Sequence, residues 1–249
     1  MSKRQEIRAR RRRERIRNRV LSILLVVAGA LFVVFALILP SINHTVTTAN
    51  TTAAPPSIQT AAPRTLAVQM DGTHMGDPNA PVKVDSWEDF QCSSCLSYSQ
   101  NVEPQLIQNY VATGKVYYTY HFFLLIDGGN PAGESHKAAD AAMCASAQGR
   151  FWDYHDILFA NWLGENVGSY TDARLVDMAS AIGLDMTSFN QCFQANTYQA
   201  QIEQDYADGQ AKGVTGTPTV FVNGTMITPG FVPSFDQLSQ AIDNALASQ

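Results

Sequence analysis

The sequence predicts an α/β layered domain with helices inserted midway, preceded by one N-terminal transmembrane helix. Three observations support this fold class. The run Val20 to Leu39 contains no charged residue. Strand-like segments rich in β-branched and aromatic residues lie on both sides of a long helical stretch. The dipeptide Asn223-Gly224 separates two alternating runs, which is a strong signal for a β-hairpin.

The first 39 residues have the pattern of a membrane anchor. Residues 1 to 19 carry ten basic and two acidic side chains, a net charge of +8, and basic residues beside a span hold that end in the cytoplasm. Residues 20 to 39 would form a helix of about 30 Å, which matches a bilayer core. A cleavable signal peptide is the alternative, but its apolar region is shorter and ends in a small-x-small site. We therefore expect an uncleaved signal anchor, with the rest of the chain outside the cytoplasm.

The rest of the chain divides into a tether and a globular domain. Residues 40 to 64 contain six Thr, five Ala and four Pro with a single charge, Arg64, which is typical of a linker. Residues 65 to 249 carry six basic and twenty acidic side chains. This acidic balance argues against nucleic acid as a partner of the domain. Four cysteines in 249 residues exclude a disulfide-dense scaffold.

Hydrophobic periodicity and turn residues divide the domain into elements. Strands are expected over 66–70, 81–90, 115–125, 219–222 and 225–228. Helices are expected over 93–111, 134–147, 151–162, 171–182, 185–213 with a break near Ala195-Asn196, and 234–247 with Ser234 as N-cap. The helices between about 130 and 212 would then form an insertion before the hairpin.

The motif Cys92-Ser93-Ser94-Cys95 lies where a strand ends and a helix begins. Free backbone N–H groups and the positive end of the helix dipole stabilise a thiolate there, so Cys92 is the expected nucleophile. Cys95, one turn further on, is placed to attack a mixed disulfide on Cys92 and release the partner. A zinc site would need a second pair of ligands, and a purely structural disulfide over so short a loop stabilises little. We therefore expect redox chemistry, with no metal and no cofactor.

Four motifs, in this order, resemble the DsbA-like branch of the thioredoxin superfamily. They are GDPNAPV at 76–82, EDFQCSSC at 88–95, ASAQGRFWDYHD at 145–156 and GVTGTPTVFVNG at 213–224. The resemblance implies a thioredoxin fold with an inserted helical subdomain over residues 65 to 249. It also implies a cis peptide bond before Pro218. Thr217-Pro218 would then flank the cysteines and present the Thr217 backbone to an extended substrate.

The chain departs from the family pattern in two places. Pro often follows the first cysteine in this branch, whereas Ser93 stands here, and neither Ser93 nor Ser94 carries a positive charge. Cys92 is therefore expected to be less acidic than in relatives with His between the cysteines. The buried acid six residues before the first cysteine is replaced by Ser86. Glu88 has the same strand parity and is a possible substitute, although carboxylates at such positions are more often solvated.

The two remaining cysteines lie in separate expected helices. In an oxidising compartment Cys144 and Cys192 could pair across the helical subdomain, and we predict this structural disulfide. The alternative is two inert buried thiols, because free cysteine packs as a small hydrophobe. His121, His136 and His155 lie in apolar elements and receive no catalytic role.

These features together predict a membrane-tethered, extracytoplasmic thiol:disulfide oxidoreductase. It would form disulfides in unfolded or cysteine-containing secreted proteins by exchange through Cys92 and Cys95. The resemblance implies reoxidation by a quinone-linked membrane partner of the DsbB or vitamin K epoxide reductase type. Two alternatives stay open: a reductase or isomerase of the same fold, and a tethered peptide-binding module whose cysteines are structural.

Overall fold

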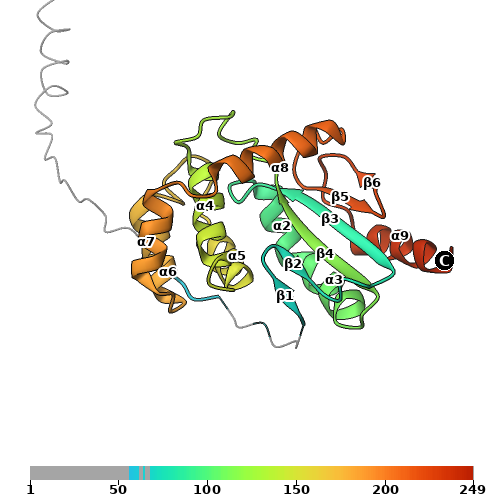
Figure 1. Cartoon of the computed structure of the whole chain (residues 1–249). Coiled ribbons are helices and arrows are strands. Elements are labelled where there is room, and N and C mark those ends of the chain that lie inside the picture. The colour runs from blue at the N-terminus through green and yellow to red at the C-terminus, as the bar shows by residue number, and fades with distance from the viewer. Residues whose placement is uncertain (1–55, 62–63, 65–67, 249) are drawn as a thin grey trace, which may run out of the picture. The chain divides into compact units, whose positions relative to one another are not determined.

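One mixed β-sheet forms the centre of the described part of the chain (Figure 1). The computed structural model describes residues 56–61, 64 and 68–248. Within these residues six strands lie in the order β1-β2-β4-β3-β5-β6. The strands are β1 (Met70–Asp71), β2 (His74–Met75), β3 (Val82–Glu88), β4 (Val116–Phe122), β5 (Thr219–Val222) and β6 (Thr225–Thr228). Strands β3 and β4 are parallel, and the other neighbouring pairs are antiparallel.

The central strand β3 divides its side chains between two buried faces. Val82, Val84 and Phe90, which follows the strand, belong to the main core, whereas Trp87 belongs to a smaller cluster on the other face. Alternation along a strand places Ser86 and Glu88 on the face opposite Trp87. Both of these polar side chains are fully buried, so β3 carries a carboxyl group into the interior.

Helices cover both faces of the sheet, and a group of helices extends beyond it (Figure 1). The helices are α2 (Ser93–Asn101), α3 (Glu103–Leu106), the π-helix η1 (Ile107–Val111), α4 (Glu134–Ser146), α5 (Phe151–Ala160), α6 (Asp172–Ala181), α7 (Met186–Gln194), α8 (Gln199–Ala211) and α9 (Phe235–Ala247). Helices α3 and α9 pack together against the main core. Helix α8 crosses the Trp87 face so closely that a Cβ on Gly209 would lie 2.7 Å from the Trp87 ring. The predicted α/β fold with inserted helices is confirmed.

Most expected elements are present, and the differences have local causes. The expected helix over 93–111 is divided, because Pro104 cannot donate a backbone hydrogen bond and lies at the start of α3. The expected strand over 115–125 ends at Phe122, because the N–H groups of Leu125 and Ile126 turn to donate to the Asp89 carboxylate, each at 3.0 Å. The hairpin is confirmed, with Asn223 and Gly224 both at positive φ.

The two cysteines of the helical subdomain are joined to each other. The sulfurs of Cys144 in α4 and Cys192 in α7 lie 2.02 Å apart, and the Cα atoms 5.8 Å apart. The bond closes a sequence separation of 48 residues, so it restrains a much longer stretch of the unfolded chain than a Cys92–Cys95 bond would.

The end of the expected linker packs on the domain. The compact unit begins at Ser57, and Ile58 and Ala61 pack against the main core. Asn161 bonds both the N–H and the carbonyl oxygen of Gln59, each at 2.8 Å. The Arg64 guanidinium lies 2.8 Å from Glu103 Oε1 and 2.6 Å from Asp156 Oδ1. A composition rich in Thr, Ala and Pro with one charge predicted a linker, but that charge, Arg64, is held in a partly buried ion-pair network.

The predicted transmembrane segment, residues 20–39, lies outside the described residues. Among the residues that the structure describes, no helix has the combination of length and hydropathy needed to cross a membrane.

Removing the Arg64 side chain should destabilise the domain. The Glu103 side chain is only 2% exposed, and a buried carboxylate that loses its cation costs about 3 kcal/mol. Arg64→Ala should therefore lower the free energy of unfolding by about that amount in urea titrations. The matched control is Arg150→Ala, whose partner Asp153 is 44% exposed, and its effect should be below about 0.5 kcal/mol. Equal effects of the two variants would contradict a structural role for the Arg64 contacts.

Candidate active site

The turn between β3 and α2 places Cys92 at the start of a helix. Cys92 is the N-cap residue of α2, with extended backbone angles, and its N–H donates to the Asp89 carbonyl oxygen at 3.0 Å. The buried Asp89 carboxylate accepts the N–H of Gln91 and two N–H groups beyond β4. Burial raises the pKa of Asp89 to about 6 despite these bonds. The carboxylate thus ties the turn to the end of the neighbouring strand.

The two free cysteines of the motif have opposite acid–base properties. The pKa of Cys92 falls to about 6, mainly because the Cys95 thiol donates a hydrogen bond to it, with further donors in Thr217 and in the N–H groups of Ser94 and Cys95. Burial opposes this shift. The pKa of Cys95 lies well above its usual value, because the side chain is fully buried and its thiol is hydrogen-bonded to Cys92. Neither Ser93 nor Ser94 carries a positive charge, so the Cys92 thiolate is stabilised by backbone N–H groups, the Thr217 side chain and the Cys95 thiol.

Glu88 is buried beneath the cysteine pair. Glu88 Oε1 accepts a hydrogen bond from Ser86 Oγ at 2.7 Å and another from the Tyr118 hydroxyl at 3.3 Å. Glu88 Oε2 is buried and has no hydrogen-bond partner among the described residues. Burial and the nearby Glu103 hold the pKa of Glu88 well above its usual range. The charge of Glu88 in turn raises the pKa of Cys95. The expectation that a carboxylate at this position is solvated is therefore wrong for Glu88. Glu88 lies in the interior on the same face of β3 as Ser86, as its strand parity allowed.

The loop before β5 brings Thr217 and Pro218 against Cys92. The Thr217-Pro218 peptide bond is cis, and the Thr217 carbonyl oxygen lies 3.4 Å from Cys92 Sγ. The Thr217 hydroxyl is buried, and among the described residues its one partner is the Cys92 thiolate, whose pKa it lowers. Thr219 Oγ1 holds the loop by donating to the Gly216 carbonyl oxygen and accepting the Gly230 N–H. The structure thus brings together Cys92, Cys95 and Thr217-Pro218 from segments more than 120 residues apart.

A second loop reaches the site from the helical subdomain, and sequence reasoning missed it. Trp162 Nε1 donates to the carbonyl oxygen of Gln91, and the Gln91 side chain accepts the N–H of Asn166 at 2.7 Å. Glu165 lies between these two contacts, with its Oε1 3.4 Å from the Ser93 nitrogen. No local pattern joins residues 72 positions apart, so only the fold could reveal this contact.

The three histidines without a predicted role lie in charged or polar contacts away from the cysteines. His121 binds Asp205 and lies near Asp85, and these carboxylates raise its pKa to about 9 against the effect of burial. His136 contacts Asp127. His155 lies with Glu103 and Asp156 in a group whose donor atoms could hold a cation, but the guanidinium of Arg64 already pairs with both carboxylates.

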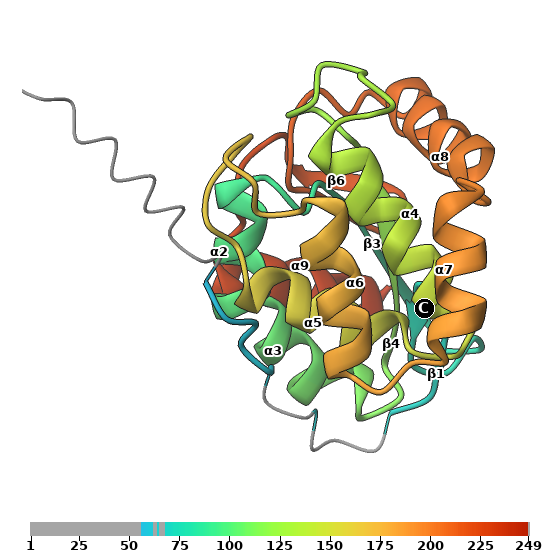
Figure 2. The same ribbon diagram turned by 90° about the vertical axis from the view of Figure 1, so that its left-hand side faces the viewer.

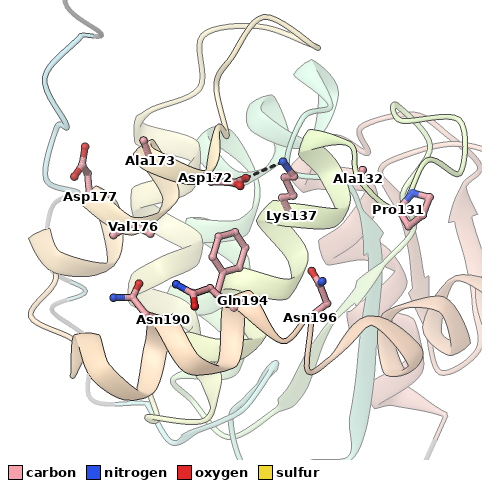
Figure 3. A pocket seen from close by; sticks show the side chains of 11 residues that line it. Pro131, Ala132, Lys137, Asp172, Ala173, Val176, Asp177, Asn190, Gln194 and Asn196 are labelled. Carbon is pink, nitrogen blue, oxygen red and sulfur yellow. Dashed lines mark ion pairs between the residues drawn. The ribbon is translucent and has the colours of Figure 1, made fainter.

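A cavity of about 720 Å³ lies in the helical subdomain and not at the cysteines (Figure 3). Its wall comes from α4, α6, α7 and the segments beside them, and it includes the Lys137–Asp172 ion pair at 2.8 Å. None of its lining residues belongs to the Cys92 motif or to the Thr217 loop. The cysteine pair therefore lies outside this cavity, and the cavity is not part of the exchange site.

Comparison with known proteins identifies the fold and the family. Residues 69–244 match a family model described as Thioredoxin. The chain belongs to the thioredoxin family. Relatives named disulfide bond formation proteins confirm the resemblance to the DsbA-like branch, and the activity of this thioredoxin-family chain is thiol:disulfide oxidoreduction.

The similar proteins are related at modest identity. The probable disulfide bond formation protein D of Bacillus anthracis is 28% identical over 174 residues, covering 69% of this chain and 77% of that protein. The Na(+)/H(+) antiporter NhaA 3 of Salinispora tropica is 31% identical over 184 residues, but these cover only 26% of the antiporter and 74% of this chain. Oxidised BdbD from Bacillus subtilis has the same fold, with a TM-score of 0.63 at 22% identity, over 77% of this chain and 99% of BdbD.

Replacing Glu88 by Gln should stabilise this thioredoxin-family domain at neutral pH. The pKa of Glu88 is higher in the folded than in the unfolded protein, where it is near 4.5. This carboxyl therefore lowers the stability of the folded protein as the pH rises above 4.5. Glu88→Gln should therefore leave the melting temperature almost unchanged at pH 4 and raise it progressively towards pH 8. The control is Glu203→Gln on the exposed side of α8, which should show no such trend. A Glu88→Gln variant that is less stable at pH 8 than at pH 4, relative to the parent, would contradict the assignment.

Proposed function

We propose that the protein is a membrane-tethered, extracytoplasmic oxidant that forms disulfides in secreted proteins through Cys92 and Cys95. The observation that carries this proposal is the difference in acidity between the two sulfurs: the pKa of Cys92 is about 6, whereas that of Cys95 lies well above its usual value. A stabilised Cys92 thiolate favours the reduced form of the pair. A pair whose reduced form is stable is a stronger oxidant of other thiols.

The exchange begins with the oxidised pair. A substrate thiolate attacks Cys92 Sγ, the Cys92–Cys95 bond breaks, and its electrons leave on Cys95, which takes up a proton because its pKa is high. Glu88 is buried beside this sulfur and keeps its own proton at a pH where an exposed glutamate has lost it, so Glu88 supplies that proton. A second substrate thiolate then attacks the substrate sulfur of the mixed disulfide. Cys92 leaves as the stabilised thiolate, and the substrate gains a disulfide.

The Thr217-Pro218 segment would hold the substrate during these steps. The Thr217 carbonyl oxygen is close to Cys92 Sγ. An extended substrate whose cysteine is at Cys92 would therefore run alongside the Thr217 backbone and pair with it as an added strand. Ser93, which is exposed, and Ser94, which is half-buried, would leave room for that chain.

The proposed place of action rests on the sequence, and the proposed redox partner rests on the resemblance to the DsbA-like branch. The uncharged run 20–39 and the basic residues before it favour a single span with a cytoplasmic N-terminus. The Cys144–Cys192 bond fits an oxidising compartment. Continued turnover needs a partner that takes two electrons from the reduced pair, for which we propose a quinone-linked membrane protein of the DsbB or vitamin K epoxide reductase type. Substrates would be unfolded or cysteine-containing secreted proteins.

Two other functions predict different behaviour of the same cysteines. A reductase or isomerase would use the same exchange chemistry with a lower reduction potential, because direction depends on the potential and not on the motif. A tethered peptide-binding module would keep its function in a Cys92→Ser variant, whereas an exchange enzyme would lose it.

The midpoint reduction potential of the Cys92–Cys95 pair should be that of an oxidant. We expect a value between about −120 and −180 mV in glutathione redox buffers, the range of oxidising folding catalysts. The measurement uses the full chain, with the redox state read by alkylation and mass. A midpoint near −270 mV, the value of thioredoxin, would contradict net oxidation and assign the protein to the reductases.

A further inference from the structure

The nucleophile has a carboxylate as a close neighbour. Glu165 is exposed and its Oε1 lies 3.4 Å from the nitrogen of Ser93, the residue directly after Cys92. The N–H groups of Ser94 and Cys95 stabilise the Cys92 thiolate. Two anions, the thiolate and Glu165, therefore share the N-terminal end of α2 through adjacent N–H groups.

The loop that carries Glu165 is held firmly against the site (Figure 2 shows it in yellow between α5 and α6, beside the start of α2). Asn166 and Trp162 both bond Gln91, the residue directly before Cys92. Further along, Glu134 accepts the N–H groups of Gly168 and Tyr170 at 2.8 and 2.7 Å. Hydrogen bonds to Gln91 and Glu134 thus fix the loop on both sides of Glu165, at the start of α2.

No cation is among the groups named as shifting the pKa of Cys92 in the part of the chain that the structure describes. These groups are the Cys95 thiol, the neutral Thr217 side chain and the N–H groups of Ser94 and Cys95. The surface beside Glu165 is apolar, since Leu163 is 45% and Val167 62% exposed. An incoming chain would thus meet a carboxylate between two apolar side chains, next to the reacting sulfur.

We propose that Glu165 is a specificity-determining residue that favours reaction partners with a positive charge beside the reacting sulfur. This proposal rests on exchange at Cys92. When a substrate thiolate attacks Cys92 Sγ and Cys95 leaves, a Lys or Arg next to the substrate cysteine pairs with Glu165 in the mixed disulfide. An acidic residue in that place is repelled by the same carboxylate.

The test uses small disulfides that react with any accessible thiolate, so it does not depend on the direction of physiological exchange. The full chain in a neutral detergent is reduced, freed of reductant and mixed with cystamine, which is cationic, or with dithiodipropionate, which is anionic. In each reaction the Cys92 thiolate attacks one sulfur, the small disulfide breaks, and one equivalent of its thiol is released. Cys95 then attacks the mixed disulfide at Cys92 and releases the second equivalent, so the initial rate of thiol release is recorded for each compound. The measured quantity is the ratio of the two rates.

Glu165→Gln should lower the cystamine-to-dithiodipropionate rate ratio about threefold at low salt, the size of effect typical for one exposed charge. Glu165→Lys should lower it further, Glu165→Asp should retain the preference, and 0.5 M salt should remove most of the difference between variants. Glu203→Gln changes the net charge equally on exposed α8 and should leave the ratio unchanged.

A ratio that is the same in Glu165→Gln and Glu203→Gln would overturn the proposal, since only the overall charge of the domain would then matter. A potential near that of thioredoxin would instead overturn the proposed direction and leave the Glu165 ratio as expected. The two failures are therefore distinguishable.

Discussion

The hydrogen bond from the Cys95 thiol to the Cys92 sulfur is the interaction on which the exchange site depends. It is the largest contribution to the low pKa of Cys92 and, with burial, it raises the pKa of Cys95. One sulfur is thereby made a good nucleophile and leaving group near neutral pH, and the other is kept protonated. The bond exists because α2 begins at Cys92 and one helical turn places Cys95 behind it.

The rest of the fold serves to keep that arrangement buried and aligned. Strand β3 delivers Glu88 to the interior below the cysteines and Trp87 to the opposite face, where α8 packs. Helix α8 leads back from the helical insertion to the Thr217 loop, which closes one side of the site. The loop after α5 closes another side through Gln91. The insertion thus supplies a wall of the active site as well as a cap on the sheet.

Local patterns in the sequence predicted most of the elements and the position of the cysteine motif at the start of a helix. The Asn223-Gly224 turn, the Ser234 helix start and the Cys92 motif each depend on neighbours within a few residues, and these features are present as expected. The resemblance supplied the cis bond before Pro218, which a Thr-Pro pair alone does not indicate. Pro104 is a possible helix break in the sequence. The apolar residues on both sides of it nevertheless continue at helical spacing, which predicted one helix where there are two.

Features that depend on distant contacts were outside the reach of such patterns. The burial of Glu88 is decided by what covers β3, and strand parity left both outcomes open. Arg64 belongs to a segment of linker composition, yet two carboxylates 39 and 92 residues away hold it on the domain. Glu165 reaches Ser93 only because the insertion folds back over α2.

The most direct test of the central claim is a titration of the Cys92 thiolate. Its absorbance near 240 nm in the reduced protein, followed against pH with Cys92→Ser as the blank, should give a pKa of about 6. Cys95 should add no transition below pH 9, because its pKa is raised well above its usual value. A single transition near the ordinary thiol value of about 8.5 would contradict the account, because the asymmetry between the two sulfurs would then be absent.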